Sequence, residues 1–377
     1  MKSCGLVGEI PYWISSQKGL RYLDLSENQL EETFPEWLAK MEVVDIILSD
    51  NSLIGSLPSC LLTNPTLRTL FLARNNFSGE LPNTNFTFRD LAFLMLASNN
   101  ILGKVPKSIY YMMYRVLDLS SNRFSSNLQN LNFLWLTIID LSSNELSGQL
   151  PIGVLTLFTT FVALGRNNFS GNLSKILTNM DGLVHVDIHD NNIIGELPKY
   201  ICQISTLRVL ILRNNSLQGS ILDCISNLSS IQILDLSNNH LVDEIPAKLG
   251  NLVGTIETPH TFSQLLEDEN YSINVNDPTV NWKKSQQALS NHNLDLYFLL
   301  DLSMNQLSSE IPTLLDNLKA LKLLDISYNN MFGKVPSSFG DLKNLESLDL
   351  SHNKLSGLIP QSLAKLQQLT MLDVSNN

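Results

Sequence analysis

Three residues of one short stretch have the side chains and the spacing that a metal site uses. His185, Asp187 and His189 alternate along "HVDIHD", so all three side chains would lie on one face of a strand. Imidazole and carboxylate groups are suitable metal ligands, but a site would need further ligands from a neighbouring strand. The neighbouring segments supply none, and Arg213 would repel a cation. We therefore expect no metal and no other cofactor.

The chain also lacks the motifs of common catalytic sites. It contains no G-x-x-x-x-G-K-[ST], no H-E-x-x-H and no set of protein-kinase motifs. Its many Ser and Asp residues recur at fixed places in a strand pattern, as Asp118 and Ser120 do, which is typical of a solvated face and not of a catalytic carboxylate pair. The sequence predicts a protein that is not an enzyme.

Composition argues against two further classes. The chain has 377 residues, of which 44% are hydrophobic, and a formal net charge of -11. Non-specific nucleic-acid binding requires clustered Lys and Arg, so we expect no nucleic-acid partner. No run of 18 apolar residues occurs, and the start "MKSCGLVGEIPYW" has no apolar signal region, so we expect neither a membrane helix nor a signal peptide within these residues. The length favours two domains or a repeat array.

A repeat with the pattern L-x-x-L-x-L-x-x-N-x-L runs along nearly the whole chain. Examples are "LRYLDLSENQL" from Leu20, "LRVLILRNNSL" from Leu207 and "LESLDLSHNKL" from Leu345. The asparagines of the repeat, here called ladder asparagines, lie 22 to 24 residues apart, except for one step of 66. They are Asn28, Asn51, Asn75, Asn99, Asn122, Asn144, Asn167, Asn191, Asn215, Asn239, Asn305, Asn329, Asn353 and Asn377.

The repeat determines the architecture. The L-x-L core has the period of a strand, and one short strand cannot bury its leucines alone. Stacking parallel strands from successive repeats buries the leucines in one continuous core. The ladder asparagine follows the strand, where its amide can satisfy buried backbone groups at the bend. We therefore predict a leucine-rich-repeat solenoid of the α/β class, with a parallel sheet on its concave face and short 3-10 or irregular segments on its convex face.

Most repeats continue with L-x-G-x-[IVL]-P, as in "SGELP" from Ser78 and "SGLIP" from Ser356. This pattern resembles the plant-specific leucine-rich repeat of cell-surface receptors and wall proteins. "CGLVGEIP" matches the second half of a repeat with Cys4 in the asparagine slot, where we expect a buried thiol. The chain also stops on a ladder asparagine, so we expect a piece of a longer protein or an incomplete gene model.

The step of 66 residues contains a non-repetitive polar segment. We divide the chain into repeats at 1–250, of which the first is partial, an island at 251–296, and four repeats at 297–377, of which the last is truncated. A long insertion within a stacked core is usually functional. The stretch "VNWKKSQQALSNHNLDLYFLLDLSMNQLSSEIP" resembles the island region of plant receptor-like proteins, in which four final repeats follow.

That resemblance implies an extracellular, ligand-binding function. Such proteins bind a peptide, protein or glycan at the plasma membrane and signal through partner kinases in immunity or development, without a kinase domain of their own. The family continues into a cap, one membrane helix and a short tail, which are absent here, so we expect membrane attachment only through a missing C-terminal helix. The alternative is a secreted wall protein that inhibits microbial polygalacturonase, although such inhibitors have shorter arrays without an island.

Departures from the usual Asp of the strand pattern indicate one candidate ligand surface. Ile47, Phe71 and Met95 take the same outward position in three consecutive repeats, and Arg74 lies beside them. Adjacent strands are about 4.8 Å apart, so these side chains would form one apolar stripe. Exposed apolar patches often mark interaction sites, unless the island or glycans cover them.

The island and the final repeats supply the other candidates. Trp282, Lys283 and Lys284 are the island residues that we expect to help bind a ligand. The final repeats carry three further candidates, each directly before a ladder asparagine. The resemblance implies that the last repeats contact a co-receptor kinase of the somatic-embryogenesis receptor kinase type. The three candidates are Met304, Tyr328 and His352.

Two further features concern the compartment. Cys202 and Cys224 lie at similar points of adjacent repeats, so they form either a disulfide or two buried thiols, whereas Cys60 has no evident mate. N-x-[ST] sequons occur about as often as chance predicts, so the extracellular assignment depends mainly on the repeat type and the island. The glycosylation candidates are Asn76, Asn85, Asn168, Asn172, Asn214, Asn227 and Asn270.

Overall fold

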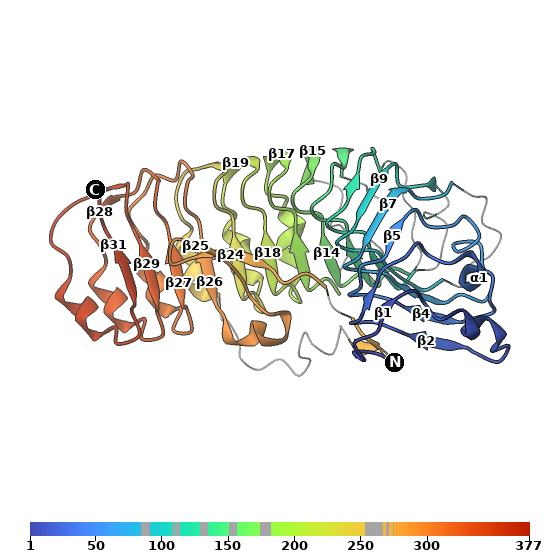
Figure 1. Ribbon diagram of the computed structural model, residues 1–377. Coiled ribbons are helices and arrows are strands. Elements are labelled where there is room, and N and C mark those ends of the chain that lie inside the picture. Colours follow the sequence, from blue (N-terminus) through green and yellow to red (C-terminus); the bar gives the residue numbers. More distant parts are fainter. Residues whose placement is uncertain are drawn as a thin grey trace. The chain divides into compact units, whose positions relative to one another are not determined.

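The structure is a computed structural model, and the chain divides into two compact units, Met1–Ser170 and Gly171–Asn377 (Figure 1). Each unit is described by itself. The described residues are 1–83, 91–107, 109, 114–128, 135–150, 157–173, 182–252, 267–268, 271–273 and 275–377. No helix within these ranges is long and apolar enough to cross a membrane.

In the first unit, three-residue strands of successive repeats pair in parallel and in register, one strand per repeat. The register places Ile47 opposite Phe71, and Phe71 opposite Met95. The strands are β2 (Tyr22–Asp24), β4 (Asp45–Ile47), β6 (Thr69–Phe71), β8 (Phe93–Met95), β10 (Val116–Asp118), β12 (Ile138–Asp140) and β14 (Phe161–Ala163).

The second unit repeats this arrangement, and its sheet runs past the island without a break. Strand β20 pairs directly with β26, although the whole island separates them in sequence. Asn305 accepts a hydrogen bond from the backbone N–H of Leu241 at 3.0 Å, which joins the two repeats on either side of the insertion. The strands are β16 (His185–Asp187), β18 (Val209–Ile211), β20 (Ile233–Asp235), β26 (Leu299–Asp301), β27 (Leu323–Asp325), β29 (Ser347–Asp349) and β31 (Met371–Asp373).

Further parallel pairing follows most of the ladder asparagines, where the L-x-G-x-[IVL]-P segments stack. The glycine of this segment adopts a positive φ, as Gly333 does at +82°, and a Cβ there would come within 3.0 Å of the Glu310 side chain. The bounds are β1 (Val7–Gly8), β3 (Gln29–Leu30), β5 (Ile54–Gly55), β7 (Asn76–Glu80), β9 (Asn100–Gly103), β11 (Arg123–Phe124), β13 (Ser147–Gln149), β15 (Asn168–Asn172), β17 (Asn192–Glu196), β19 (Ser216–Ser220), β21 (His240–Val242), β28 (Phe332–Gly333) and β30 (Lys354–Leu355).

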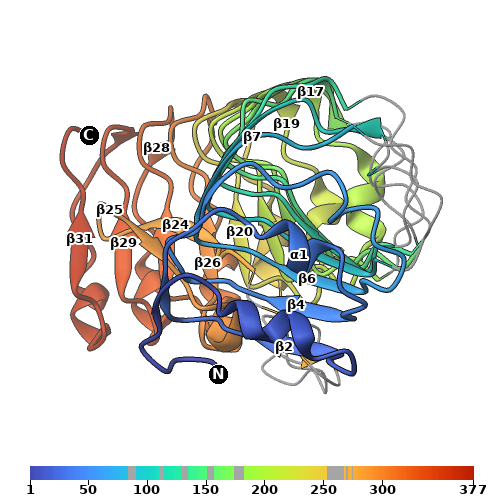
Figure 2. The ribbon, with the colours of Figure 1, turned by 45° about the vertical axis from the view of Figure 1, so that its right-hand side comes forward.

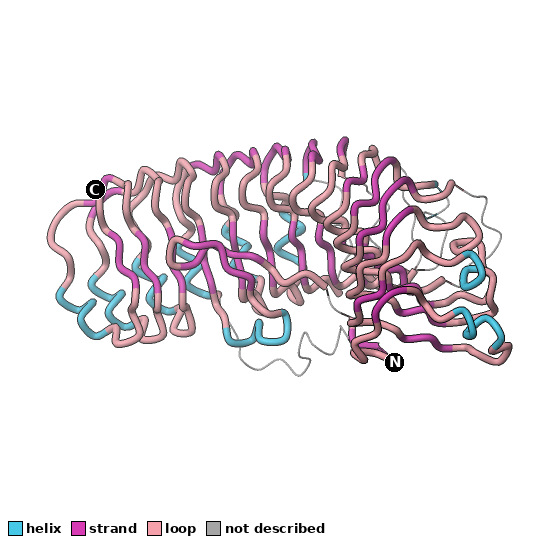
Figure 3. Tube along the Cα trace, viewed as in Figure 1, coloured by secondary structure: helices cyan, strands magenta, loops and turns pink. Residues whose placement is uncertain are grey.

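Short helices occupy the side away from the sheet in most repeats for which the structure describes that side (Figure 3). Most begin directly after the proline of the repeat, because its fixed φ suits a helix start and its missing N–H is not needed there. The bounds are η1 (Tyr12–Ser16), α1 (Glu36–Ala39), η5 (Lys199–Gln203), η6 (Asp223–Asn227), η7 (Ala247–Asn251), η9 (Thr313–Asn317), η10 (Ser337–Asp341) and η11 (Gln361–Lys365). Parallel strands on one side and mainly 3-10 helices on the other confirm the predicted leucine-rich-repeat solenoid.

The ladder asparagines form hydrogen bonds with backbone groups at the bend, as their position predicts. The Asn329 amide nitrogen donates to the carbonyls of Ile326 and Ser327 in its own repeat and of Leu302 in the preceding repeat, at 3.0 to 3.2 Å. Its amide oxygen accepts the backbone N–H of Leu307 at 3.0 Å. One side chain thus satisfies four backbone groups and connects two repeats. Cys4, in contrast, is exposed and not a buried thiol, because it lies on the outermost turn of the described chain.

The island forms its own small elements. They are β22 (Glu267–Asp268), β23 (Tyr271–Ser272), β24 (Thr279–Trp282), β25 (Ser285–Ala288) and η8 (Asn291–Leu296). Strands β24 and β25 pair as an antiparallel hairpin, with Trp282 opposite Ser285 next to the turn. We call this hairpin, residues Thr279–Ala288, the strap. In Figures 1 and 2 it crosses the strands of the second unit.

Candidate ligand-binding surfaces

The predicted apolar stripe lies in register but is not exposed. Ile47, Phe71 and Met95 occupy neighbouring positions of β4, β6 and β8, as the repeat spacing predicts. Their exposed fractions are only 8, 7 and 5%, so the expectation of an open apolar patch is wrong for this structure. Bulky side chains on strands about 4.8 Å apart cover much of each other's surface. A role of the stripe in ligand binding stays a prediction.

Arg74 stands beside this stripe and is itself exposed. It lies one residue before a ladder asparagine, in the left-handed region at φ 55°. Its Nε and Nη2 donate to the two carboxylate oxygens of Asp50 in the preceding repeat, at 2.5 and 2.7 Å. This bidentate geometry fixes the guanidinium. A ligand at this position would meet an ion pair that is already formed.

The sequence argument missed a second outward column, which lies six places before each ladder asparagine. In the second unit its members Val209, Ile233, Leu299 and Leu323 are adjacent in register and 0 to 3% exposed. Strand alternation turns these side chains away from the leucine core, so an outer layer must cover them. The sequence could have predicted this column, because an apolar residue recurs between the first two leucines of successive repeats.

The strap crosses the strands that carry this column. Along β24, Val280 and Trp282 are buried while Asn281 between them is exposed, so one face of the hairpin is turned toward the sheet. The Trp282 ring packs edge-on against Tyr297, with 5.6 Å between centroids. The indole nitrogen Nε1 of Trp282 is buried and has no hydrogen-bond partner among the described residues. Trp282 therefore packs the island onto the repeats and is not open to a ligand in this state.

The two island lysines are also engaged with the final repeats. Lys283 forms an ion pair with Glu346 at 3.2 Å, and Lys322 pairs with the same carboxylate at 2.9 Å. Lys284 pairs with Asp373 on β31. The Nζ of Lys283 also lies 5.3 Å from the centre of the Trp282 ring. The structure thus shows both lysines anchoring the turn of the strap, whereas a direct role in ligand binding stays a prediction.

Two buried arginines fix the other end of the island. Arg213 donates to the Thr279 carbonyl at 2.5 Å and to its hydroxyl at 2.8 Å, and pairs with Asp235 at 3.3 Å. Arg208 pairs with Asp295, just beyond the strap, at 2.7 Å. The strap is therefore held at both ends: residues that flank β18 fix its start, and Glu346 and Asp373 fix its turn.

The three co-receptor candidates form a row on the second unit. Met304 and Tyr328 are 50 and 52% exposed, and each lies just before its ladder asparagine in the left-handed region. The rings of Tyr328 and His352 stack with centroids 3.9 Å apart and an interplanar angle of 13°. Asn376 lies next in this row, 3.0 Å from Nε2 of His352. The structure brings these residues together, and contact with a partner stays a prediction.

The histidine stretch does not assemble a metal site in the described part of the chain. No group of three or more His, Cys, Asp or Glu residues there has the arrangement to hold an ion. Nδ1 of His189 lies 2.5 Å from the Asp187 carboxylate. Burial lowers the pKa of His185 to about 4, so that ring is neutral over most of the physiological pH range. These residues pack within the sheet face.

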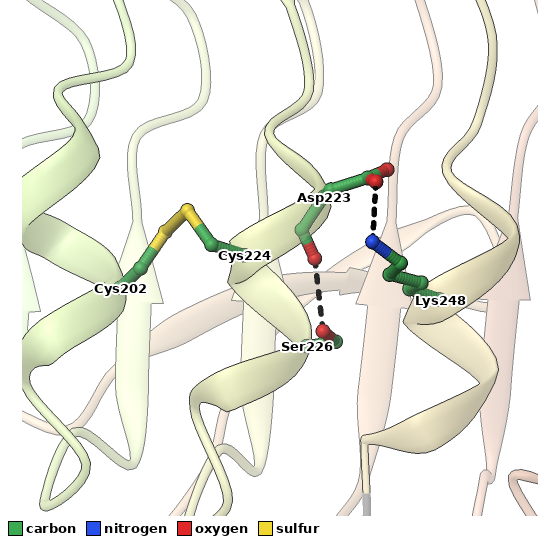
Figure 4. Close-up of a disulfide and its surroundings, with 5 residues drawn as sticks. All are labelled: Cys202, Asp223, Cys224, Ser226 and Lys248. Carbon is green, nitrogen blue, oxygen red and sulfur yellow. Dashed lines mark hydrogen bonds and ion pairs between the residues drawn. A yellow bond between two sulfur atoms is a disulfide. The ribbon is translucent and has the colours of Figure 1, made fainter.

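Of the two alternatives for Cys202 and Cys224, the structure shows the disulfide (Figure 4). The Cα atoms are 5.5 Å apart, on consecutive helices η5 and η6. Next to the bridge, Lys248 of η7 pairs with Asp223 of η6 at 2.8 Å. Cys60 is a free, half-buried thiol.

The sequon asparagines differ in their surroundings. Asn76, Asn168, Asn172, Asn214 and Asn227 are exposed, as glycan attachment would require. The Asn214 amide nitrogen, however, donates to Asp190 at 2.6 Å, so a glycan there would replace an existing hydrogen bond. Asn85 and Asn270 lie outside the described residues. Glycosylation at all seven positions stays a prediction.

Comparison with known proteins agrees with this fold. Leucine-rich-repeat family models match residues 19–41, 66–86, 206–228, 230–252, 320–342 and 335–377. Receptor-like protein 46 of Arabidopsis thaliana is 61% identical over 41 residues, which are 11% of this chain and 5% of that protein.

Solved structures extend the similarity to the full chain. The Arabidopsis receptor kinase HAESA, in complex with the peptide hormone IDA and the co-receptor SERK1, matches with a TM-score of 0.81 and 30% identity. That match covers 100% of this chain and 56% of the HAESA chain. PEPR1 in complex with AtPEP1 shares the fold, with a TM-score of 0.67 and 24% identity over 98% of this chain and 54% of that one.

The repeats, the island and these matches define the class: the chain is a leucine-rich-repeat protein with the fold of plant receptor ectodomains. More specifically, the similarity is to plant leucine-rich-repeat receptors, among them a receptor-like protein and a receptor kinase. It spans just over half the length of the HAESA ectodomain that it matches.

Proposed function

We propose that this chain is the ligand-recognition region of a plant cell-surface receptor-like protein. It binds a peptide, protein or glycan on the extracellular side of the plasma membrane. It signals through partner kinases, in immunity or development, and has no catalytic activity of its own. The observation that supports the proposal is the match of this whole chain to part of a receptor that was crystallised with a peptide hormone and a co-receptor.

The geometry of the second unit supports this assignment. The strap exposes polar side chains, among them Asn281, Gln286 and Gln287, which can hydrogen-bond to an extended ligand. The row of Met304, Tyr328 and His352 lies on the same unit and includes large exposed side chains. Clustered aromatic and Met side chains at a surface favour protein contacts. We assign this row to the co-receptor.

A recruitment assay tests the proposal. The full chain is immobilised and offered the SERK1 ectodomain, with and without a plant cell-wall peptide fraction. We expect recruitment that depends on the peptide fraction, and no inhibition of polygalacturonase by the chain. Inhibition of that enzyme without recruitment would favour the wall-inhibitor alternative instead.

Substitution of the stacked pair locates the co-receptor surface. Tyr328→Ala combined with His352→Ala should weaken recruitment at least about tenfold, because each truncated anchor costs on the order of 1 kcal/mol or more. Ser98→Ala changes the equivalent exposed position of an earlier repeat and serves as the matched control. Equal recruitment by the double variant and the control would remove the row from the proposal.

A further inference from the structure

The strap is a two-stranded sheet, so each of its strands has one edge with which the other strand does not pair. Strand β24 is held against the repeats, because Val280 and Trp282 are buried. Its Thr279 carbonyl also accepts a hydrogen bond from Arg213 at 2.5 Å. Strand β25 differs, since all four of its residues, Ser285–Ala288, are exposed. The open edge of the strap is therefore that of β25.

The two strands of the strap also differ in how their faces are covered. Trp282 lies opposite Ser285, and cross-strand partners in an antiparallel pair lie on the same face. Val280 and Gln287 are likewise opposite each other and share this face. The two residues of β24 are buried there, whereas the two residues of β25 are exposed. Strand β25 is therefore accessible on both faces, and neither face is closed to an incoming strand.

The hydrogen-bonding pattern of the hairpin determines which backbone groups of β25 face outward. The Leu289 N–H donates to the Pro278 carbonyl at 2.9 Å, directly beside the last paired residues of the two strands. Hydrogen-bonded and non-hydrogen-bonded pairs alternate along an antiparallel ladder. The N–H and C=O groups of Gln286 and Ala288 therefore point away from β24, and within the described part of the chain none of them has a hydrogen-bond partner.

Strand β25 also lacks the features that protect an edge from further pairing. Natural edge strands are usually protected by a charged residue, a proline or a bulge. The sequence of β25 is Ser-Gln-Gln-Ala, and its pairing with β24 is regular at all four positions. Its outward groups are two N–H donors and two C=O acceptors. The backbone of an extended peptide complements such an edge.

The edge is ordered before any ligand arrives. The turn of the strap consists of Lys283 and Lys284, whose φ values of 52° and 62° are typical of a tight two-residue hairpin. Both lysines are also paired with carboxylates of the final repeats, Glu346 and Asp373. Buried Arg213 fixes the other end of the strap. An edge that is already fixed loses little conformational freedom when a ligand binds to it.

From this geometry we propose that the chain binds its ligand by strand addition. An extended peptide segment pairs with the open edge of β25 and becomes the third strand of the strap. The inference rests on the proposed function, and it selects a peptide segment from the ligand classes named there. Main-chain hydrogen bonds supply most of the affinity, and exposed side chains of the strap, such as Gln286 and Gln287, supply specificity.

Peptide selection with the full chain tests strand addition. The wild type selects binders from a display library of random linear peptides, and the selected peptides are synthesised. Gln286→Pro removes one outward N–H but leaves the inner pairing of the hairpin in place. These peptides should bind Gln286→Pro at least about tenfold more weakly than Gln286→Ala, which keeps that N–H, because the proline ring also occupies the edge. Protected amides of Ser285 and Gln287 verify that the hairpin persists in both variants.

The outcomes separate this inference from the proposed function. Equal affinity of the two variants for the selected peptides would overturn strand addition, although the chain would still be a peptide receptor. Failure of the wild type to select any peptide would also overturn strand addition. A protein or glycan ligand would then remain compatible with the proposed function, which the recruitment assay tests separately.

Two measurements on the wild type need no variant of the chain. Methylation of the backbone nitrogens of a selected peptide, one at a time, should weaken binding at least about tenfold at every second position, since alternate N–H groups of an added strand face β25. Hydrogen exchange at residue resolution should show that the amides of Gln286 and Ala288 become protected only when the peptide is bound. A methylation profile without this alternation, or unchanged exchange at both amides, would overturn the inference.

Discussion

At the scale of single residues, the ladder asparagines stabilise the stacking of neighbouring repeats through hydrogen bonds. Asn329 combines two tasks: its amide nitrogen donates to three carbonyls, and its amide oxygen accepts one N–H of the preceding repeat. The residue before each ladder asparagine adopts a positive φ, as Tyr328 does at 51°. The asparagine hydrogen bonds hold this otherwise unfavourable backbone in place.

Replacement of one ladder asparagine should therefore destabilise the stack strongly. Asn329→Ala leaves four backbone groups without their partner, and each buried unsatisfied group costs roughly 1–3 kcal/mol. We expect the free energy of unfolding to fall by at least about 2 kcal/mol, measured by urea denaturation. Asn281→Ala, at an exposed position of the strap, is the control and should change it by less than about 0.5 kcal/mol.

The residue scale also shows where sequence reasoning reaches its limit. The positions of Asn329 and its equivalents were predictable, because a fixed period places them without any knowledge of long-range contacts. The partners of Lys283 and Lys284 were not, because Glu346 and Asp373 lie 63 and 89 residues further along the chain. Only the folded arrangement shows that these lysines anchor the strap.

At the scale of elements, consecutive 3-10 helices approach each other closely at one recurrent place. The fourth residue of one helix faces the second residue of the next. In η5 and η6 these are Cys202 and Cys224, which form the disulfide, and in η10 and η11 they are Gly340 and Ser362. The pattern explains why the cysteines are 22 residues apart and not a full repeat of 24.

Removal of the disulfide should lower stability by about 3 kcal/mol, the loop-closure value for a loop of this length. Cys202→Ser combined with Cys224→Ser is compared with Cys60→Ser, a free thiol, by thermal unfolding. We expect a lower Tm for the double variant only, and a similar decrease for the wild type when a reductant is added. An unchanged Tm of the double variant would show that the bridge does not contribute.

A methyl group at Gly340 should disturb the same kind of contact. A Cβ there would lie 2.3 Å from the carbonyl oxygen of Ser362, so η10 and η11 would have to separate. Gly340→Ala should cost about 1–3 kcal/mol, as overpacking does. Gly19→Ala, with open space around its Cβ position, should be near neutral in the same urea titration.

At the scale of the whole molecule, buried aspartates make stability depend on pH. Burial, with Asp140 as a second cause, raises the pKa of Asp118 to about 7. The native carboxyl therefore keeps a proton that the unfolded chain releases above about pH 4, and stability falls as pH rises from about 4 to about 7. Burial of His185 gives the opposite slope, because its lowered pKa costs stability as pH falls from about 6.5 toward 4.

Comparison with a variant isolates the aspartate contribution. When pH rises from 4.5 to 7.5, the unfolding free energy of Asp118→Asn should increase relative to that of the wild type by more than about 1 kcal/mol. Urea midpoints at the two pH values measure it. A difference that is independent of pH would contradict the raised pKa of Asp118.

The sequence predicted the solenoid and the placement of its repeats, because the leucine and asparagine periods encode both locally. It did not predict that Ile47, Phe71 and Met95 are buried, since exposure depends on how neighbouring side chains cover each other. The outward apolar column of Val209 and Ile233 was visible in the repeat, but the sequence did not show that the strap crosses the strands of the second unit.

The direct pairing of β20 with β26 has a consequence for how such a protein can change. Because the framework closes across the point where the island leaves and returns, the inserted segment bears none of the stacking between repeats. The length and composition of the island can vary while the leucine core of the stacked repeats stays intact. Different recognition loops could therefore be inserted at this junction without a change in the repeats on either side.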